Sequence, residues 1–114
     1  MTAPRPLTQF QSQVYFLCSQ IPLNHVTTYK IIAEFLISSP RAIGQALKNN
    51  PFDPSLVPCH RVIKSNLLIG GYQGKTTKEK IFLKQKRLAE EGIFFNAKGY
   101  LLTKNIFQNF QRKL

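Results

Sequence analysis

Hydrophobic residues near the start of the chain recur at helical spacing. Most are three or four positions apart and would share one helix face: Phe10, Val14, Leu17, Cys18 and Ile21. The pattern predicts a first helix over about residues 8–20, which Pro22 would stop. Residues 1–7 are Pro-rich and are expected to form a flexible tail, so that residues 8–114 make up a single domain.

The next pattern predicts two short helices joined by a tight turn. Thr27 or Thr28 can cap the first of them, because a threonine hydroxyl accepts from the free amides of a helix start. Ser39 can cap the second, which would run over about residues 40–49 with Pro40 at its first position. The second helix is rich in small residues, and such a pair is typical of a helix-turn-helix. Small side chains let a backbone approach either the neighbouring helix or a nucleic-acid groove.

The second half of the chain predicts shorter elements around one more helix. A loop with three prolines leads to residues 59–63, which are expected to be a short strand or a turn. A loop with three glycines, over residues 65–77, precedes a helix over about 78–90. Residues 93–102 fit a small hairpin, a plausible wing, and residues 103–114 are basic and amphipathic and could be helical. The predicted fold class is mainly α, a winged-helix-like helix-turn-helix domain with a small β-hairpin.

Composition excludes several classes of protein. No run of about 18 apolar residues exists, so no membrane-spanning helix is expected. The N-terminus lacks the apolar core of a signal peptide, which favours an intracellular protein, in the cytoplasm or, in a eukaryote, the nucleus. Cys18 and Cys59 would then stay reduced. They do not combine with His25 and His60 at the usual zinc-ligand spacing, so no metal site is predicted.

The charge of the chain is strongly unbalanced. Lys and Arg number 16 against 5 Asp and Glu, a formal net charge of +11. Such an excess in a small domain indicates a polyanionic partner, with nucleic acid the natural candidate and an acidic membrane surface the alternative. A solvated surface is the simpler explanation for part of the excess, notably at Lys98, Lys104, Arg112 and Lys113.

Candidate chemistry is concentrated in the segment Pro58-Cys59-His60. It places a potential nucleophile directly beside a potential base, and a neighbouring imidazole raises the thiolate population of a cysteine. Adjacent side chains on an extended strand point apart, so contact between the two would need a tight turn or a bridging water. From the dipeptide alone, a buried cysteine beside a surface histidine is the simpler interpretation.

The residues around this pair resemble the motifs of one family. Val57-Pro58-Cys59-His60-Arg61-Val62-Ile63 resembles the active-site signature of the O6-alkylguanine-DNA alkyltransferases, the methylated-DNA–protein-cysteine methyltransferases. Four further segments resemble that family's motifs in the family's own order: Thr27-Thr28-Tyr29, Arg41-Ala42-Ile43-Gly44-Gln45-Ala46, Asn50-Pro51 and Gly71-Tyr72. Together they span roughly residues 10–102, and the resemblance is to the family's catalytic and DNA-binding domain.

The resemblance implies a chemical role for four side chains. Cys59 would take the alkyl group from O6 of guanine, or from O4 of thymine, in a single-turnover reaction that needs no cofactor. His60 would activate the thiol through water, and Glu91 would orient His60. Glu90 is the fallback, because the segment before it is several residues longer than in common members, and a surface carboxylate is the alternative. Tyr29 would donate a proton or hydrogen bond to the leaving guanine, or else be a core tyrosine.

The resemblance also implies a base pocket. It would be lined by Pro58, Val62, Tyr72 and Gln73. Gln73 stands where the family usually has a small hydroxyl residue, so transfer would be slower if that hydroxyl is required. Asn24 stands where the family usually has Gly, which is a mild departure because asparagine tolerates a left-handed turn.

DNA binding is implied on the helix that carries the small residues. A base inside a duplex is unreachable, so the target nucleotide would be flipped out, with Arg41 filling the vacated stack. The protein would bind the minor groove of double-stranded DNA as a monomer with little sequence preference. The residues concerned would be Thr28, Arg41, Ala42, Gly44 and Gln45, with Asn50 bracing the turn that follows.

Three rival hypotheses remain open. Alkyltransferase-like proteins bind DNA lesions without catalysis and commonly carry Trp at the nucleophile position, where this chain has Cys59. A winged-helix transcription regulator would use the same basic surface, but it has no reason to hold Cys59, His60, Tyr29 and Tyr72 together. A Cys-His hydrolase is the weakest, because it explains neither the helix-turn-helix nor the charge.

Overall fold

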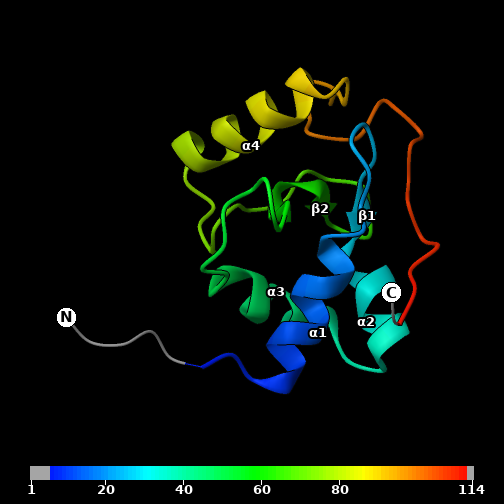
Figure 1. The fold of residues 1–114 in the computed structure, drawn as a ribbon. Coiled ribbons are helices and arrows are strands. Elements are labelled where there is room, and N and C mark those ends of the chain that lie inside the picture. The colour runs from blue at the N-terminus through cyan, green and yellow to red at the C-terminus, as the bar shows by residue number, and fades with distance from the viewer. Residues whose placement is uncertain (1–5, 113–114) are drawn as a thin grey trace.

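The structure, a computed structural model, describes residues 6–112 and is built mainly from helices (Figure 1). Three helices lie on one side of a small two-stranded sheet, and a fourth lies on the other side. This arrangement confirms the predicted fold class. In chain order the elements are α1 (Gln9–Cys18), β1 (Thr27–Thr28), α2 (Tyr29–Leu36), α3 (Pro40–Lys48), the 3-10 turn η1 (Cys59–Arg61), β2 (Val62–Ile63) and α4 (Lys78–Glu90).

Side-chain caps explain where the two helices of the helix-turn-helix begin. Thr28, the second of the two candidate threonines, caps α2 by accepting from the Ile31 amide at 3.1 Å. Ser39 caps α3 by accepting from the Ala42 amide, also at 3.1 Å, and Pro40 occupies the first helical position. A proline there costs no hydrogen bond, because the first amides of a helix have no partner within it. Both starts lie at their predicted positions.

The first and last helices also keep close to their predicted bounds. The Thr8 hydroxyl caps α1, which ends at Cys18, two residues before the predicted end. Thr77 caps α4, whose bounds agree with the prediction. Residues 1–5 of the predicted tail lie outside the described residues. Within residues 6–112, no helix combines the length and apolar character that a bilayer crossing requires.

The small parallel sheet lies between two hydrophobic cores. Thr27 pairs with Val62 and Thr28 pairs with Ile63. Val62 packs in the core of α1, α2 and α3, whereas Ile63 packs in a second core beneath α4 and the hairpin. Successive strand residues point to opposite faces, so two residues are enough to contact both cores. The turn that carries Cys59, directly before β2, is thereby held between the two groups of helices.

The predicted hairpin is present in a short version. Phe95 and Leu101 form an antiparallel bridge, and the Asn96 amide donates to the Tyr100 carbonyl at 2.8 Å. The Asn96 side chain accepts from the Tyr100 amide at 2.9 Å, and Gly99 takes a φ of 89°. A residue with a side chain rarely adopts this φ, so Gly99 is what allows the chain to reverse here.

The C-terminal segment (residues 103–112) is extended, so the predicted helix is wrong. Val26 bridges to Ile106 in parallel, and the Phe107 amide donates to the Val26 carbonyl at 2.7 Å. Ile106 packs in the core beneath α4, whereas Phe110 is buried in the core of α1, α2 and α3. An extended chain rises about twice as far per residue as a helix and can therefore reach both cores.

The turn before β1 confirms what the sequence indicates for Asn24. This residue has a φ of 68°, in the left-handed region where asparagine is tolerated. Its backbone carbonyl accepts from the Asn105 side chain at 2.9 Å, which ties the turn to the C-terminal segment.

Candidate active site

Cys59 stands at the start of a single 3-10 turn. Its amide donates to the Val57 carbonyl at 2.8 Å, and the Arg61 amide donates to the Pro58 carbonyl at 2.9 Å. The chain therefore turns tightly before it enters β2, so the two side chains are not held apart as on an extended strand. Because β2 is in register with β1, Tyr29, which directly follows β1, lines the same pocket as Cys59.

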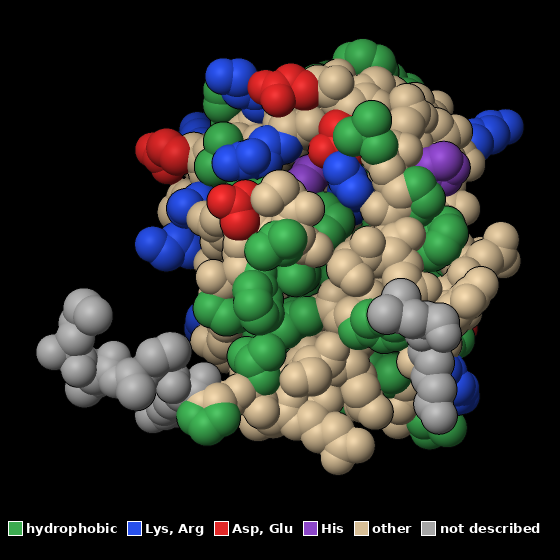
Figure 2. Space-filling view, viewed as in Figure 1, with side chains coloured by type: hydrophobic (Ala, Val, Ile, Leu, Met, Phe, Trp, Pro, Cys, Tyr) green, Lys and Arg blue, Asp and Glu red, His purple; other side chains and the backbone are tan. Residues whose placement is uncertain are grey.

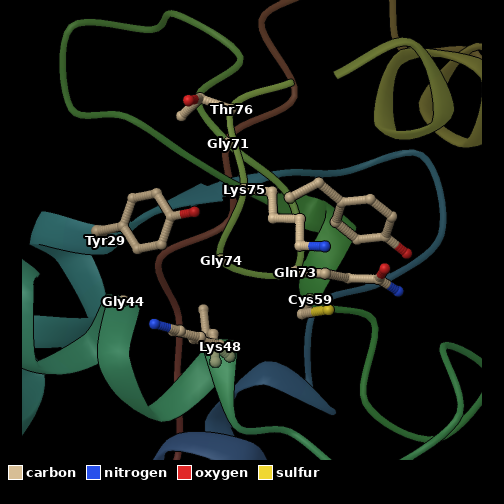
Figure 3. Close-up of a pocket in the computed structure, with 11 residues that line it drawn as sticks. Tyr29, Gly44, Lys48, Cys59, Gly71, Gln73, Gly74, Lys75 and Thr76 are labelled. Atoms are coloured by element: carbon tan, nitrogen blue, oxygen red, sulfur yellow. The ribbon is translucent and has the colours of Figure 1, made fainter. Parts of the chain in front are cut away.

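A pocket of about 160 Å3 opens beside Cys59 (Figure 3). Tyr29 enters it from α2, Gly44 from α3, and Tyr72 and Gln73 from the loop after β2. The Tyr29 hydroxyl points toward the centre of the pocket (Figure 3). The fold thus brings together residues that are up to 47 positions apart in the chain, from Tyr29 to Thr76.

Two residues predicted for the pocket are buried and do not line it. Pro58 is buried, and Val62 is fully buried against α1, α2 and α3, and neither lines the pocket. Lys48, Lys75 and Thr76 line it in their place. The sequence held no signal for these three, because Lys48 lies on α3 and Lys75 and Thr76 lie in the loop before α4, and only the tertiary fold brings them to one pocket.

A tight two-residue turn forms one wall of the pocket. Tyr72 and Lys75 exchange backbone hydrogen bonds of 2.9 and 3.0 Å, and the two residues between them, Gln73 and Gly74, have φ values of 54° and 76°. Two successive positive φ values are typical of a type I′ turn. The Gln73 side chain accepts from Lys80 Nζ at 2.5 Å, so its amide is tied to α4.

His60 and Arg61 share one carboxylate. His60 Nε2 lies 2.7 Å from Glu91 Oε2, and Arg61 donates to the same carboxylate through Nε at 2.8 Å and Nη2 at 3.1 Å. Glu91, and not the exposed Glu90, is therefore the partner of His60. Arg61, for which the sequence suggested no role, also donates to the Ile21 carbonyl at 2.8 Å and so links the site to the end of the first helical segment.

The pKa shifts of His60 and Glu91 determine which of the two carries a proton at neutral pH. Burial lowers the pKa of His60 and outweighs the opposite effect of Glu91. Burial acts to raise the pKa of Glu91, but hydrogen bonds from Arg61 and His60 together hold it below its ordinary value. At neutral pH a neutral imidazole therefore donates from Nε2 to an ionised carboxylate. The buried Nδ1 has no hydrogen-bond partner among the described residues and is a proton acceptor.

Cys59 and Tyr29 have pKa values raised by their surroundings. Burial raises the pKa of the Cys59 thiol, and the Asn50 side chain, Lys84 and Arg87 oppose that rise. Burial and the charge of Cys59 raise the pKa of Tyr29 to about 12. Tyr29 is thus a hydrogen-bond donor at neutral pH, and Cys59 needs a base to become a thiolate.

Lys84, a residue for which no role was predicted, is fully buried behind the pocket. Burial lowers its pKa to about 7, with the charge of Cys59 acting in the opposite direction. The sequence contains a signal for this burial, because Lys84 comes three residues after Ile81 and four before Leu88 and so lies within the apolar stripe of α4. Its Nζ donates to three backbone carbonyls, at 2.7, 2.6 and 3.0 Å: those of Val62, Ile69 and Gly71.

The outer face of α3 carries polar, basic and small residues. Its exposed or half-buried positions follow a spacing of three and four: Arg41, Gly44, Gln45 and Lys48. A second pocket of about 330 Å3, the basic groove, adjoins this face and is lined by Tyr29, Lys30, Pro40, Arg41, Gly44, Lys64 and Ser65. The described residues that line the two pockets include no carboxylate.

Three other residues predicted to contact or support DNA binding lie around this face. Thr28 is 5% exposed and caps α2, so it lies beneath the surface and does not form part of it. Ala42 is half-buried near the start of α3. The Asn50 side chain accepts from the Phe52 amide at 2.9 Å, which fixes the turn that leaves α3.

Charged side chains are spread over the molecule. On the face in Figure 2, Lys and Arg side chains are the commonest charged groups, and most of the acidic ones lie with them toward the α4 side. Among residues 6–112, no three His, Cys, Asp or Glu side chains gather closely enough to hold a metal ion.

Fold and site together define a class of protein: a helix-turn-helix domain with a half-buried cysteine, backed by a His–Glu pair, in a pocket next to a basic groove. The family model described as 6-O-methylguanine DNA methyltransferase, DNA binding domain, matches residues 9–93. The chain belongs to this family.

Individual relatives agree with this assignment. The methylated-DNA–protein-cysteine methyltransferase of Pyrobaculum aerophilum is 47% identical over 72 residues, which cover 63% of this chain and 45% of that protein. The structure of Mycobacterium tuberculosis OGT in complex with DNA has a TM-score of 0.66 at 33% identity, over 75% of this chain and 51% of that one. The structure of S. pombe Atl1 with damaged DNA containing O6-carboxymethylguanine has a TM-score of 0.70 at 28% identity, over 90% of this chain and 98% of that one. The chain spans about half the length of the curated relatives it matches.

Proposed function

We propose that this protein repairs alkylated DNA by moving the alkyl group from O6 of guanine to its own Cys59. The observation that carries the proposal is the placement of the Cys59 thiol in a pocket, with the paired His60 and Glu91 beside it and the Tyr29 hydroxyl opposite. A displacement at saturated carbon needs a soft nucleophile, a base and a donor for the leaving group, and these side chains supply all three.

The proposed steps follow from the protonation states of Cys59, His60 and Tyr29 at neutral pH. The Cys59 thiol loses its proton through a bridging water to Nδ1 of His60, and Glu91 stabilises the imidazolium. The thiolate attacks the alkyl carbon, so that a C–S bond forms while the C–O bond breaks. The electron pair of the broken C–O bond stays with guanine, and a ring nitrogen of guanine takes a proton from the Tyr29 hydroxyl. His60 returns the proton through solvent to Tyr29, which leaves intact guanine and an S-alkylcysteine.

DNA would approach the outer face of α3. Gly44 leaves room for a close approach, since a Cβ built there meets no atom within 4 Å. Arg41 is exposed at the start of this helix and lines the basic groove, where it can fill the stack that a flipped nucleotide vacates. We propose that the protein binds duplex DNA from the minor-groove side, as a monomer and with little sequence preference.

The decisive experiment measures intact mass after incubation with a duplex that contains O6-methylguanine. Transfer predicts a gain of about 14 Da, one methylene, that stops at one equivalent. The gain should vanish in Cys59→Ala and persist in Cys18→Ala. No gain in the unmodified protein, with lesion and control duplexes bound equally, would overturn the repair proposal.

A second candidate function is lesion binding without transfer. The observation that favours it is the match to S. pombe Atl1, of which the alignment covers 98%, against about half of the methyltransferases. Cys59 argues for transfer, because a binder needs no thiol in the pocket. Lesion-selective DNA binding with no mass gain would place the protein in this second class.

A further inference from the structure

Arg87 occupies a position on α4 that the proposed reaction does not use. It follows Lys84 by three residues and precedes Glu91 by four, so it lies on the same side of the helix as two residues of the site. Its Nε is buried and has no hydrogen-bond partner among the described residues. No ion pair within the described chain includes it, although Glu91 is one turn away.

Arg87 Nε is one of three buried polar atoms at the site that have no direct partner within residues 6–112. The others are Nδ1 of His60 and the hydroxyl of Tyr72, which is 2% exposed. Buried polar atoms are normally satisfied, so atoms such as these are available to bind water or a substrate. The charge of Arg87 opposes the rise in the pKa of Cys59 and of Tyr72, and it adds to the lowering of the pKa of His60. Along α4, Arg87 lies between Lys84, which donates to the Val62 and Gly71 carbonyls, and Glu91, which binds His60, so it faces the turn that carries Cys59.

Lys48 and Lys75 line the pocket of Cys59, and both are exposed to solvent. The other buried or half-buried basic groups around Cys59 do not supply a constant positive charge. His60 is neutral because burial lowers its pKa, and Arg61 is neutralised by Glu91. Lys84 has a pKa of about 7 and loses its charge as the pH rises above neutrality. The charged or titratable groups that act on Cys59 or respond to it come from every element packed against it: Tyr15 and Cys18 of α1, Tyr29 of α2, Tyr72 of the following loop, and Lys84 and Arg87 of α4.

We infer that Arg87 is a positioning residue for Cys59: its guanidinium is a permanent cation on the α4 side of the site that stabilises the Cys59 thiolate. A guanidinium stays protonated at pH values where a lysine with a lowered pKa has lost its proton, so its effect does not fade when Lys84 becomes neutral. The inference rests on the proposed function, in which Cys59 acts as a thiolate.

The test is the pH dependence of Cys59 alkylation by iodoacetamide, followed by peptide mass. This reaction needs no DNA, so it stays informative even if alkyl transfer from DNA fails. Arg87→Met keeps the length of the side chain and removes the charge. We expect its rate-against-pH curve to move to higher pH, with alkylation at neutral pH slower by about three- to tenfold.

Two variants separate charge from packing. Arg87→Lys keeps the charge and should retain the unmodified curve, and Lys86→Met removes a charge from the exposed neighbouring position and should leave it unchanged. Equal curves for Arg87→Met and the unmodified protein would overturn the inference. A uniform slowing at every pH, with no shift of the midpoint, would also overturn it, since that is the result of a packing defect. If Arg87→Met does not fold, as judged by circular dichroism, Arg87→Gln takes its place.

Discussion

At the scale of single residues, the site depends on Glu91, whose carboxylate binds two basic side chains, His60 and Arg61. It holds Nε2 of His60 at 2.7 Å and Nε of Arg61 at 2.8 Å, and all three side chains are mostly buried. A buried ion pair becomes costly when one partner loses its charge, because the other is left without compensation in a poorly solvated place. The same carboxylate therefore supports both the fold and the tautomer of His60.

Glu91→Gln tests this double role. The amide has nearly the same shape but leaves the Arg61 guanidinium without its counter-charge, so we expect a loss of about 2 kcal/mol in the free energy of unfolding. Alkyl transfer should slow on the order of 100-fold, because His60 is no longer held as the acceptor. Denaturant unfolding and single-turnover kinetics measure the two effects. Glu90→Gln, which removes an exposed charge from the adjacent residue, should change neither quantity, and equal effects of the two substitutions would contradict the assignment.

Lys84 gives a prediction about pH. Its pKa of about 7 lies below the ordinary value of 10.5, so between these values the unfolded chain binds the proton and the folded protein does not. The free energy of unfolding therefore rises with pH across this window because of Lys84. Lys84→Met should be less stable by about 2–4 kcal/mol, because three buried carbonyls lose their donor.

The measurement compares denaturant unfolding of the two proteins at pH 7, 8 and 9. The stability difference between the unmodified protein and Lys84→Met should grow with pH, while the titration of other groups cancels in the difference. A difference that stays constant over these values would show that Lys84 does not change its protonation on folding.

At the scale of elements, α3 has two faces with separate tasks. Ile43, Ala46 and Leu47 are buried against the other helices, whereas Arg41 and Gly44 face outward. Helical spacing and the caps were enough to predict this helix and its outward residues. The place of the turn after Tyr72 in the pocket wall could not be predicted in this way, because it depends on close contact with α3. Gly74 lies so near α3 that a Cβ added to it would come within 2.5 Å of the Lys48 side chain.

Gly44→Ala separates the two tasks of α3. No atom lies within 4 Å of the added methyl group, and alanine is the better helix former, so the free energy of unfolding should rise by about 0.5–1 kcal/mol. DNA binding should weaken, on the order of tenfold, because the methyl group occupies space that a close approach requires. Thermal unfolding and fluorescence anisotropy with a labelled duplex measure the two effects. Unchanged affinity would mean that DNA does not approach this face closely.

At the scale of the whole molecule, the distribution of charge matters more than its total. The net charge of +11 attracts any polyanion, but only cations near the bound DNA release counterions from it. Lys64 lines the basic groove with Arg41, whereas Lys104 is exposed on the C-terminal segment. The two lysines carry the same charge and differ only in whether they line the basic groove.

Lys64→Met and Lys104→Met therefore test where DNA binds. Replacing Lys64 should reduce the slope of log K against log salt by about 1, the amount expected for one phosphate contact. Replacing Lys104 should leave the slope unchanged. Binding titrations at several salt concentrations measure both slopes. An equal change for the two substitutions would indicate that the protein attracts DNA through its overall charge and not through the basic groove.

The sequence by itself determined the local elements and the kind of chemistry. Caps, helical spacing and turn residues are local signals, and they predicted four helices, the helix-turn-helix and the hairpin. The motif around Cys59 predicted the family, the nucleophile and its histidine. The tertiary structure alone decided what lies beside these residues. It extended the C-terminal segment across two cores, buried Val62 and Pro58 away from the pocket, chose Glu91 over Glu90, and buried Lys84 and the Nε atom of Arg87. Such contacts join residues far apart in the chain, and their energies depend on burial, which no local pattern of residues records.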